Sequence, residues 1–219
     1  MKKMFFAGLL AIAVIFTAYS QTGVIRELTG EVEIKPAGAS AFVPAQSGAQ
    51  VAQDTIISTG FRSTAIVVVG VTTITVRPLT RLSLAEISST AGTENLNVNL
   101  QAGRVRVDVK PPAGTKANTT VQSPSATASV RGTVLDMDAY NLEVIEGKVL
   151  FKGSDGILVS VLGGTKSTVS SEGSAQNPID LAKDNLMPSG PVGKGAAGET
   201  TGGASDAPVI GDIGLDINW

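Results

Sequence analysis

Between Gly23 and about Val169 the chain consists of short runs in which apolar and polar residues alternate, interrupted by Gly, Pro, Asn or Ser. Alternation with a period of two indicates β-strands that bury one face, and closely spaced turn residues indicate that the strands are short. Helix periodicity is nearly absent from this region. The pattern therefore predicts a single all-β domain over residues 21–170.

The most regular alternation consists of two consecutive runs separated by Ala102-Gly103. A two-residue turn at this dipeptide would join the runs as a hairpin, with Leu100 opposite Val105, because that loop length keeps both apolar sets on one face. The same register would place Asn99 beside Arg106 on the outer face. We therefore expect a hairpin here.

Two other runs, 65–69 and 156–162, are apolar almost without interruption, which predicts strands buried on both faces or nearly so. Such strands indicate layered sheets, either a sandwich or a short solenoid-like roll of mostly antiparallel strands. A pattern of glycine, charged residue, Val, any residue and large apolar residue begins at Gly30, Gly103 and Gly147 and favours the roll. Because its spacing is irregular, we interpret each glycine as a turn that enters a strand.

One short helix is predicted after the β domain, within residues 171–187. Asn177 is a favourable N-cap residue, and Pro178 follows it at the first helical position, where proline fits best. We expect this helix to end near Met187.

The last 32 residues divide into two parts. Residues 188–208 are rich in Gly, Ala, Ser and Pro, a composition that predicts a flexible linker with a reach of about 25 Å. In residues 209–219 apolar and polar residues alternate again, so we expect an amphipathic strand that docks either on a partner or on an edge of its own domain. Its candidate docking residues are Ile213, Leu215, Ile217 and Trp219.

Residues 1–20 have the pattern of a secretory signal peptide. Lys2 and Lys3 precede an apolar run too short for a comfortable membrane span, and small residues allow cleavage near Ser20. The alternative is an uncleaved N-terminal anchor. Cleavage would remove two lysines from the 17 basic residues and leave 15 against 19 acidic ones, a net charge of −4. We expect a periplasmic or secreted protein with no membrane span after cleavage.

The composition excludes several kinds of chemistry. The 219 residues include no Cys and no His, so disulfides, thiolate or imidazole metal sites, Cys nucleophiles and His-based triads are impossible. A negative net charge makes nucleic acid an improbable partner. The G-x-G-x-x-G pattern at residues 193–198 lacks the strand before it and the helix after it that a nucleotide site needs. We expect no cofactor, no metal and no catalytic residue.

Asp136 and Asp138 are the remaining candidates for acid–base chemistry. They lie two residues apart on a predicted strand, which would place their carboxylates roughly 6–7 Å apart, near the separations that glycoside hydrolases use. The simpler interpretation is a solvated acidic strand face, because a catalytic acid needs a cleft and a raised pKa.

The segment Val130-Arg131-Gly132-Thr133, followed by Glu146-Gly147 and Val149, resembles the signature of the FecR-domain family. Three upstream segments resemble the family in the same order: Gly30-Glu31-Val32, Asp54 to Gly60, and Leu100 to Val105. The cytoplasmic anti-sigma segment and membrane span of the iron-signalling members have no counterpart in this sequence. The resemblance covers about residues 23–169.

We interpret the signature as mainly structural. Gly132 permits a left-handed turn, Thr133 can bind the turn backbone, and Arg131 can donate to carbonyls at a buried bend; alternatively, Arg131 presents its guanidinium group to an anion. The signature residues are Val130, Arg131, Gly132, Thr133, Glu146 and Gly147.

The resemblance implies a non-catalytic protein-binding or scaffold module at the bacterial cell envelope, with an envelope protein as its partner. One alternative is an accessory sensor in envelope or iron-uptake signalling that acts through a membrane partner. A carboxylate-based glycan hydrolase is a third.

Overall fold

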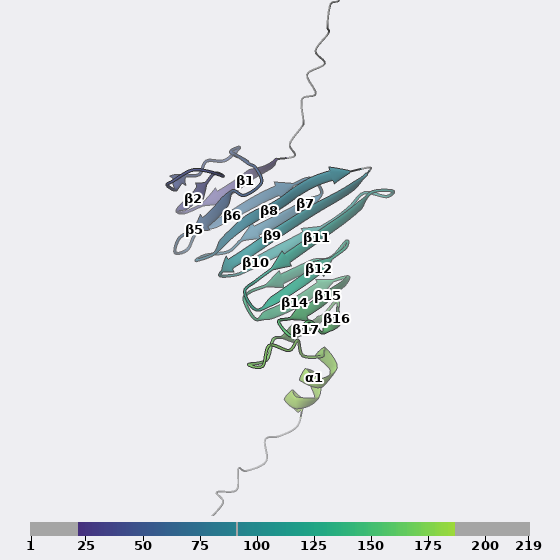
Figure 1. Ribbon diagram of the computed structural model, residues 1–219. Helices are drawn as coiled ribbons and strands as arrows, with labels where there is room; N and C mark the ends of the chain where they lie inside the picture. Colours follow the sequence, from purple (N-terminus) through teal and green to yellow (C-terminus); the bar gives the residue numbers. More distant parts are fainter. Residues whose placement is uncertain (1–21, 91, 187–219) are drawn as a thin grey trace, which may run out of the picture. The chain divides into compact units, whose positions relative to one another are not determined.

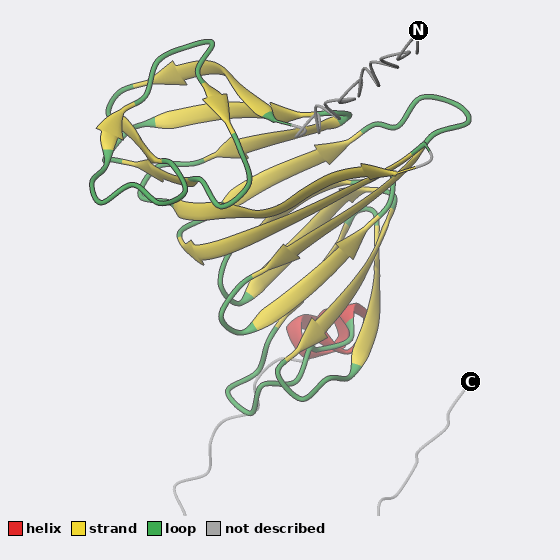
Figure 2. Ribbon diagram, turned by 45° about the horizontal axis from the view of Figure 1, so that its top comes forward, coloured by secondary structure: helices red, strands yellow, loops and turns green. Residues whose placement is uncertain are grey.

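The computed structural model describes residues 22–90 and 92–186 of the chain. These residues form 17 strands and one short helix, so the prediction of an all-β domain followed by a single helix is confirmed. The strands form two sheets that enclose one apolar core (Figures 1 and 2). We refer to the eight-stranded sheet as sheet A and to the nine-stranded sheet as sheet B.

Sheet A has the spatial order β17, β14, β13, β10, β7, β6, β1 and β4. In that order its strands are Thr165–Thr168, Asn141–Glu146, Val134–Met137, Val105–Val109, Thr72–Val76, Thr64–Val69, Gly23–Thr29 and Gln50–Val51. Sheet B has the order β16, β15, β12, β11, β9, β8, β5, β2 and β3. Its strands are Leu158–Leu162, Lys148–Gly153, Ala126–Val130, Lys116–Gln122, Thr93–Ala102, Arg81–Thr90, Ile56–Thr59, Val32–Lys35 and Val43–Pro44.

The chain crosses repeatedly from one sheet to the other. Strands β6 and β7 lie in sheet A, β8 and β9 in sheet B, β10 in sheet A, and β11 and β12 in sheet B. Neighbouring strands are antiparallel except β9 and β11, which are parallel. In both sheets the strands thus follow one another from one edge to the other nearly in sequence order. The fold is a two-sheet roll, one of the two architectures expected.

The core is built from the inward-facing half of each strand. In β10 the side chains of Val105, Val107 and Val109 are buried, whereas Arg106 between them faces solvent. Core residues are mostly aliphatic, and Phe151 is fully buried among them. Each fully buried side chain of this kind contributes about 1.5–3 kcal/mol, so the alternation in the sequence is the main source of the fold's stability.

The hairpin predicted around Ala102-Gly103 is wrong. Strand β9 pairs with β8 and β11, whereas β10 pairs with β7 and β13. Leu100 is therefore not paired with Val105, and Asn99 and Arg106 lie on different sheets. The apolar side chains of β9 and of β10 still face one core. A corner that carries the chain from one sheet to the other keeps these side chains on the inner face, as a tight turn would.

Gly103 and Thr80 explain why the chain forms a corner at this position. Gly103 has a φ of +88°, and a Cβ atom on it would lie 2.5 Å from the Cα atom of Thr80. The Thr80 hydroxyl accepts a hydrogen bond from the N–H of Arg104 at 3.0 Å and donates one to its carbonyl at 3.1 Å. A distant part of the chain thus fixes the corner, and the local sequence does not show this.

The two apolar runs are not buried on both faces. In β6, Ile66 and Val68 are only half-buried, although their neighbours are buried. The run 156–162 differs more, because it forms the edge strand β16, in which Leu158 and Leu162 are 61% and 56% exposed. The prediction assumed that an uninterrupted apolar run lies inside a sheet, which is wrong for a strand at the edge.

Helix α1 spans Pro178–Leu186, in agreement with the predicted helix. The Asn177 side chain accepts a hydrogen bond from the N–H of Ile179 at 3.0 Å, which is the expected N-cap. Among residues 22–90 and 92–186, no helix is both long enough and apolar enough to cross a membrane.

Three predicted segments lie outside the described residues. They are the signal peptide at residues 1–20, the linker at residues 188–208 and the C-terminal amphipathic strand with Ile213, Leu215, Ile217 and Trp219. These predictions remain expectations from the sequence.

Candidate interaction surface

The outer face of sheet A carries a row of charged side chains. The strand register places Arg106 of β10 opposite Asp136 of β13, Asp136 opposite Glu143 of β14, and Glu143 opposite Lys166 of β17. Directly opposed side chains in a sheet have Cβ atoms about 4.5–5.5 Å apart. Each carboxylate in the row therefore has a cation as a neighbour.

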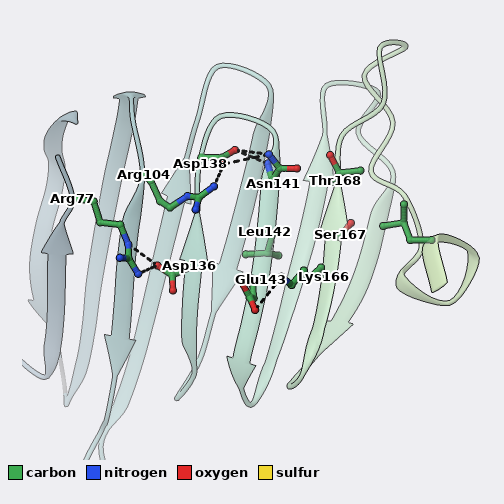
Figure 3. A pocket seen from close by; sticks show the side chains of 11 residues that line it. Arg77, Arg104, Asp136, Asp138, Asn141, Leu142, Glu143, Lys166, Ser167 and Thr168 are labelled. Carbon is green, nitrogen blue, oxygen red and sulfur yellow. Dashed lines mark hydrogen bonds and ion pairs between the residues drawn. The ribbon is translucent and has the colours of Figure 1, made fainter. Parts of the chain in front are cut away.

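Asp136 binds two arginines, of which Figure 3 shows Arg77. Its Oδ1 atom accepts hydrogen bonds from Nε and Nη2 of Arg77 at 3.2 and 2.9 Å, and its Oδ2 atom accepts from Nε and Nη2 of Arg106 at 3.0 and 2.8 Å. The Asp136 side chain is 12% exposed, whereas Arg77 and Arg106 are 41% and 44% exposed. The carboxylate thus lies beneath two guanidinium groups and fixes the orientation of both.

Asp138 forms a second, adjacent pair. Its Oδ2 atom accepts a hydrogen bond from Nη2 of Arg104 at 2.8 Å, and its Oδ1 atom accepts from the backbone N–H groups of Tyr140 and Asn141 at 3.0 and 2.8 Å. Burial raises the pKa of Asp138, but the bonds from Arg104 and from these N–H groups outweigh it and lower the pKa below its usual value. The same pair raises the pKa of Arg104, mainly through the hydrogen bond to Asp138.

An open hollow of about 470 Å³ lies over these pairs. Its wall includes Arg77, Arg104, the ion pair of Lys166 with Glu143 at 3.3 Å, and Leu181 of α1. Arg77 and Arg104 are 41% and 56% exposed, whereas the Asp136 and Asp138 side chains that bind them are 12% and 19% exposed, so the guanidinium groups lie nearer to solvent than these two carboxylates. In the described part of the chain, the Nη1 atoms of Arg77 and Arg106 donate to no protein group. These donors are available to a ligand.

This arrangement is suited to binding an anion and poorly suited to acid–base catalysis. A general acid needs a raised pKa so that it is protonated near neutral pH, whereas the pKa of Asp138 is lowered. Both carboxylate oxygens of Asp136 already accept hydrogen bonds from arginines. Within residues 22–90 and 92–186, no group of three or more acidic side chains is placed to hold a metal ion. We call Arg77, Arg104 and Arg106, with the aspartates beneath them, the arginine face.

The signature residues lie away from the arginine face, at the corner between β12 and β13. Gly132 has a φ of +57°, the left-handed conformation that the sequence predicts. The buried Thr133 hydroxyl donates to the carbonyls of Arg131 and Lys148 at 3.1 and 3.2 Å. A Cβ atom on Gly147 would lie 2.8 Å from this hydroxyl oxygen. The corner and the turn that contains Gly147 therefore pack closely against each other.

The remaining signature residues are Val130, Glu146 and Arg131. Val130 is a buried core residue at the end of β12, and Glu146 ends β14 with an exposed side chain. Arg131 does not donate to buried carbonyls as expected; its side chain is exposed, and Nε donates to Oδ1 of Asn118 at 2.9 Å on the outer face of sheet B. At this bend the Thr133 hydroxyl, and not Arg131, lies within hydrogen-bond distance of the carbonyls of Arg131 and Lys148.

The sequence pattern points to Asp136 and Asp138 but not to the arginines that bind them. The alternation predicts that Arg104 and Arg106 lie on the polar face of a strand, but it does not predict their partners. It predicts nothing about Arg77. The wrong hairpin is the reason, because it pairs β10 with β9 and so places Arg106 beside Asn99 instead of Asp136. The alternating charges of residues 104–108 are the signal that was available.

Comparison with known proteins gives a family match. The family model described as FecR protein matches residues 54–150, a range that includes the corner at Gly132 and both Asp136 and Asp138. None of the curated proteins matches the chain in sequence.

Two crystal structures of a proposed anti-sigma factor from Parabacteroides distasonis, at 1.65 and 2.50 Å resolution, are similar to the chain. Each has a TM-score of 0.45 and 16% sequence identity, and the similar region covers 58% of this chain and 62% of that protein. The match thus spans less than two thirds of the length of that protein.

Proposed function

We propose that this chain is a non-catalytic protein-binding module of the bacterial cell envelope, located in the periplasm or outside the cell, and that it binds an acidic segment of a protein partner on the arginine face. The observation that carries the proposal is the pair of guanidinium groups held on the single carboxylate of Asp136, whose side chain is 12% exposed. The family match over residues 54–150 is consistent with a regulatory or signalling role.

Preorganisation is the physical reason to expect binding here. A free arginine side chain has about 2 kcal/mol of rotamer entropy to lose when it is fixed, and Asp136 has already fixed Arg77 and Arg106. Their outward-facing donors form charge-assisted hydrogen bonds with carboxylates, which are roughly twice as strong as neutral ones. Arg104 extends the same surface along the chain just before β10. An acidic peptide of extended conformation would contact all three side chains.

The envelope location rests on the signal-peptide pattern of residues 1–20. Mass spectrometry of the protein purified from cells tests it directly. We expect a mature N-terminus close to Gln21 in an extracytoplasmic fraction. An intact N-terminus in the cytoplasm would refute this part of the proposal.

A role as an accessory sensor that acts through a membrane partner is the second candidate, favoured by the match to the FecR protein model. The identity of the partner distinguishes the two. Photo-crosslinking from a residue beside the arginine face, such as Thr75, would capture a membrane receptor or signalling protein if the chain is a sensor, and a soluble or peripheral envelope protein if it is a scaffold.

The binding proposal is tested with a synthetic peptide rich in Asp and Glu. We expect Arg77→Gln and Arg106→Gln together to weaken binding at least tenfold, and we expect added salt to weaken binding to the native chain. Arg131→Gln combined with Lys148→Gln is the matched control, since it also removes two positive charges, from exposed side chains on the outer face of sheet B. Equal binding by all the variants would contradict the proposal.

A further inference from the structure

The two sheets have four edge strands, and three of them are protected from pairing with another chain. Strands β3 and β4 have only two residues each, and β3 contains Pro44. The end of β17 is covered by the chain that follows it, because the N–H of Gln176 donates to the carbonyl of Thr168 at 2.9 Å. Short strands, proline and covering segments are the usual means by which proteins block edge pairing.

The fourth edge strand, β16, is neither short nor interrupted by proline, and in the described part of the chain the start of helix α1 lies beside it without a backbone hydrogen bond to it. It contains five residues without a charge or a proline, Leu158-Val159-Ser160-Val161-Leu162. Leu158 and Leu162 are exposed on its outer face, and Leu150 of the neighbouring strand is 43% exposed beside them. A hollow of about 340 Å³ is lined by the strand on one side and by Asn177, Pro178 and Ile179 at the start of α1 on the other. An exposed apolar edge of this kind is a site for strand addition.

The free backbone groups of β16 can be identified from the register. The N–H of Gly163 donates to the carbonyl of Gly147 at 2.8 Å, and in an antiparallel pair every second residue bonds to the same neighbour. The N–H and C=O groups of Leu158, Ser160 and Leu162 therefore point away from β15. The Thr165 hydroxyl donates to the Leu162 carbonyl at 2.7 Å, which agrees with this direction and leaves that carbonyl a second lone pair.

The sequence of β16 is the same in both directions. If two copies pair antiparallel about a two-fold axis at Ser160, Leu158 of each copy lies opposite Leu162 of the other, and the two Ser160 residues face each other. Such a contact is isologous, because both copies contribute the same surface. The outward N–H and C=O groups of Ser160 then bond to Ser160 of the other copy, and those of Leu158 bond to Leu162 of the other copy. The exposed leucines become a shared apolar cluster.

We propose that the β16 edge is a self-association surface, and that two copies of this chain join there into one continuous sheet by antiparallel pairing centred on Ser160. The contact involves one five-residue strand from each copy, which places it among the small, weak interfaces. It lies on sheet B, whereas the arginine face lies on sheet A, so failure of one proposal leaves the other intact.

The register predicts the outcome of a charge-pattern experiment on the full mature chain. Leu158→Lys combined with Leu162→Lys places like charges opposite each other at both ends of the pairing and should give a monomer. Leu158→Glu combined with Leu162→Lys changes the same two positions but places opposite charges together, so dimerisation should be retained and should weaken with salt. Both side chains are exposed, and thermal unfolding verifies that the variants remain folded.

Sedimentation equilibrium measures the result. We expect the native chain to show a monomer–dimer equilibrium that depends on protein concentration, and we expect slow exchange of the Ser160 amide hydrogen in the dimer. A native chain that stays monomeric at the highest attainable concentration would overturn the proposal. So would a monomer in which the Leu158→Lys, Leu162→Lys variant changes the fluorescence of Trp219, the single tryptophan, because the C-terminal segment would then occupy the edge.

Discussion

Replacing Asp136 by Asn removes the charge that holds the arginine face together. The native carboxylate accepts two hydrogen bonds from Arg77 and two from Arg106. The Asp136→Asn variant keeps the shape of the side chain but offers one oxygen instead of two. At least one arginine must lose its partner, and the two guanidinium groups are left close together without a neutralising charge.

The magnitude follows from the exposure of the groups. Ion pairs between exposed side chains contribute about 0.2–1 kcal/mol each, and the upper end applies here because the Asp136 side chain is only 12% exposed. Two such pairs give a loss of about 2 kcal/mol in the free energy of unfolding. A change of 1 kcal/mol shifts the melting temperature of a domain of this size by about 2–4 °C. We therefore expect the variant to melt about 4–8 °C below the native chain.

Urea denaturation followed by circular dichroism measures this loss, and thermal melting checks it independently. Asp180→Asn is the matched control, since Asp180 also pairs with a cation, Lys183, but both side chains are more than 60% exposed. We expect the control to lose less than about 0.5 kcal/mol. A similarly small loss for Asp136→Asn would refute the argument that the largely buried carboxylate organises the arginines.

Three further predictions concern the fold. The pKa of Asp138 is lower in the folded state than in the unfolded state, where it is about 3.9. Its charge therefore stabilises the folded state above a pH of about 3.9, and this stabilisation is lost as the pH falls through the lower folded-state pKa. The Asp138→Asn variant should show a smaller decrease of the urea midpoint at acid pH. Gly147→Ala should cost about 1–3 kcal/mol, more than Gly164→Ala, because both have positive φ but only Gly147 has close neighbours. Phe151→Ala, at a fully buried position, should cost about 3–5 kcal/mol in the same assay.

The strands and the core could be predicted from the sequence because alternation reports which side chains face inward. It places Val105 and Val107 correctly in the core, although the partner strand expected for them is wrong. The helix at Pro178 is also predictable, since its cap and its first residue are local signals.

Strand pairing could not be predicted, because it depends on contacts between residues far apart in the sequence. Thr80, 24 residues before Arg104, fixes the corner that separates β9 from β10. The arginine face depends on the same information, since Arg77 and Asp136 are 59 residues apart. The exposure of β16 could not be predicted for a related reason, because an apolar run does not show whether a strand has one neighbour or two.

Titration of the native chain with an acidic peptide, followed through the arginine side-chain Nε–H signals in NMR spectra, tests the proposed function most directly. The proposal predicts that the signals of Arg77, Arg104 and Arg106 shift together and saturate at one peptide per protein molecule, while the signal of Arg131 stays unchanged. Shifts at Arg131 alone, or equal small shifts at every arginine, would contradict it.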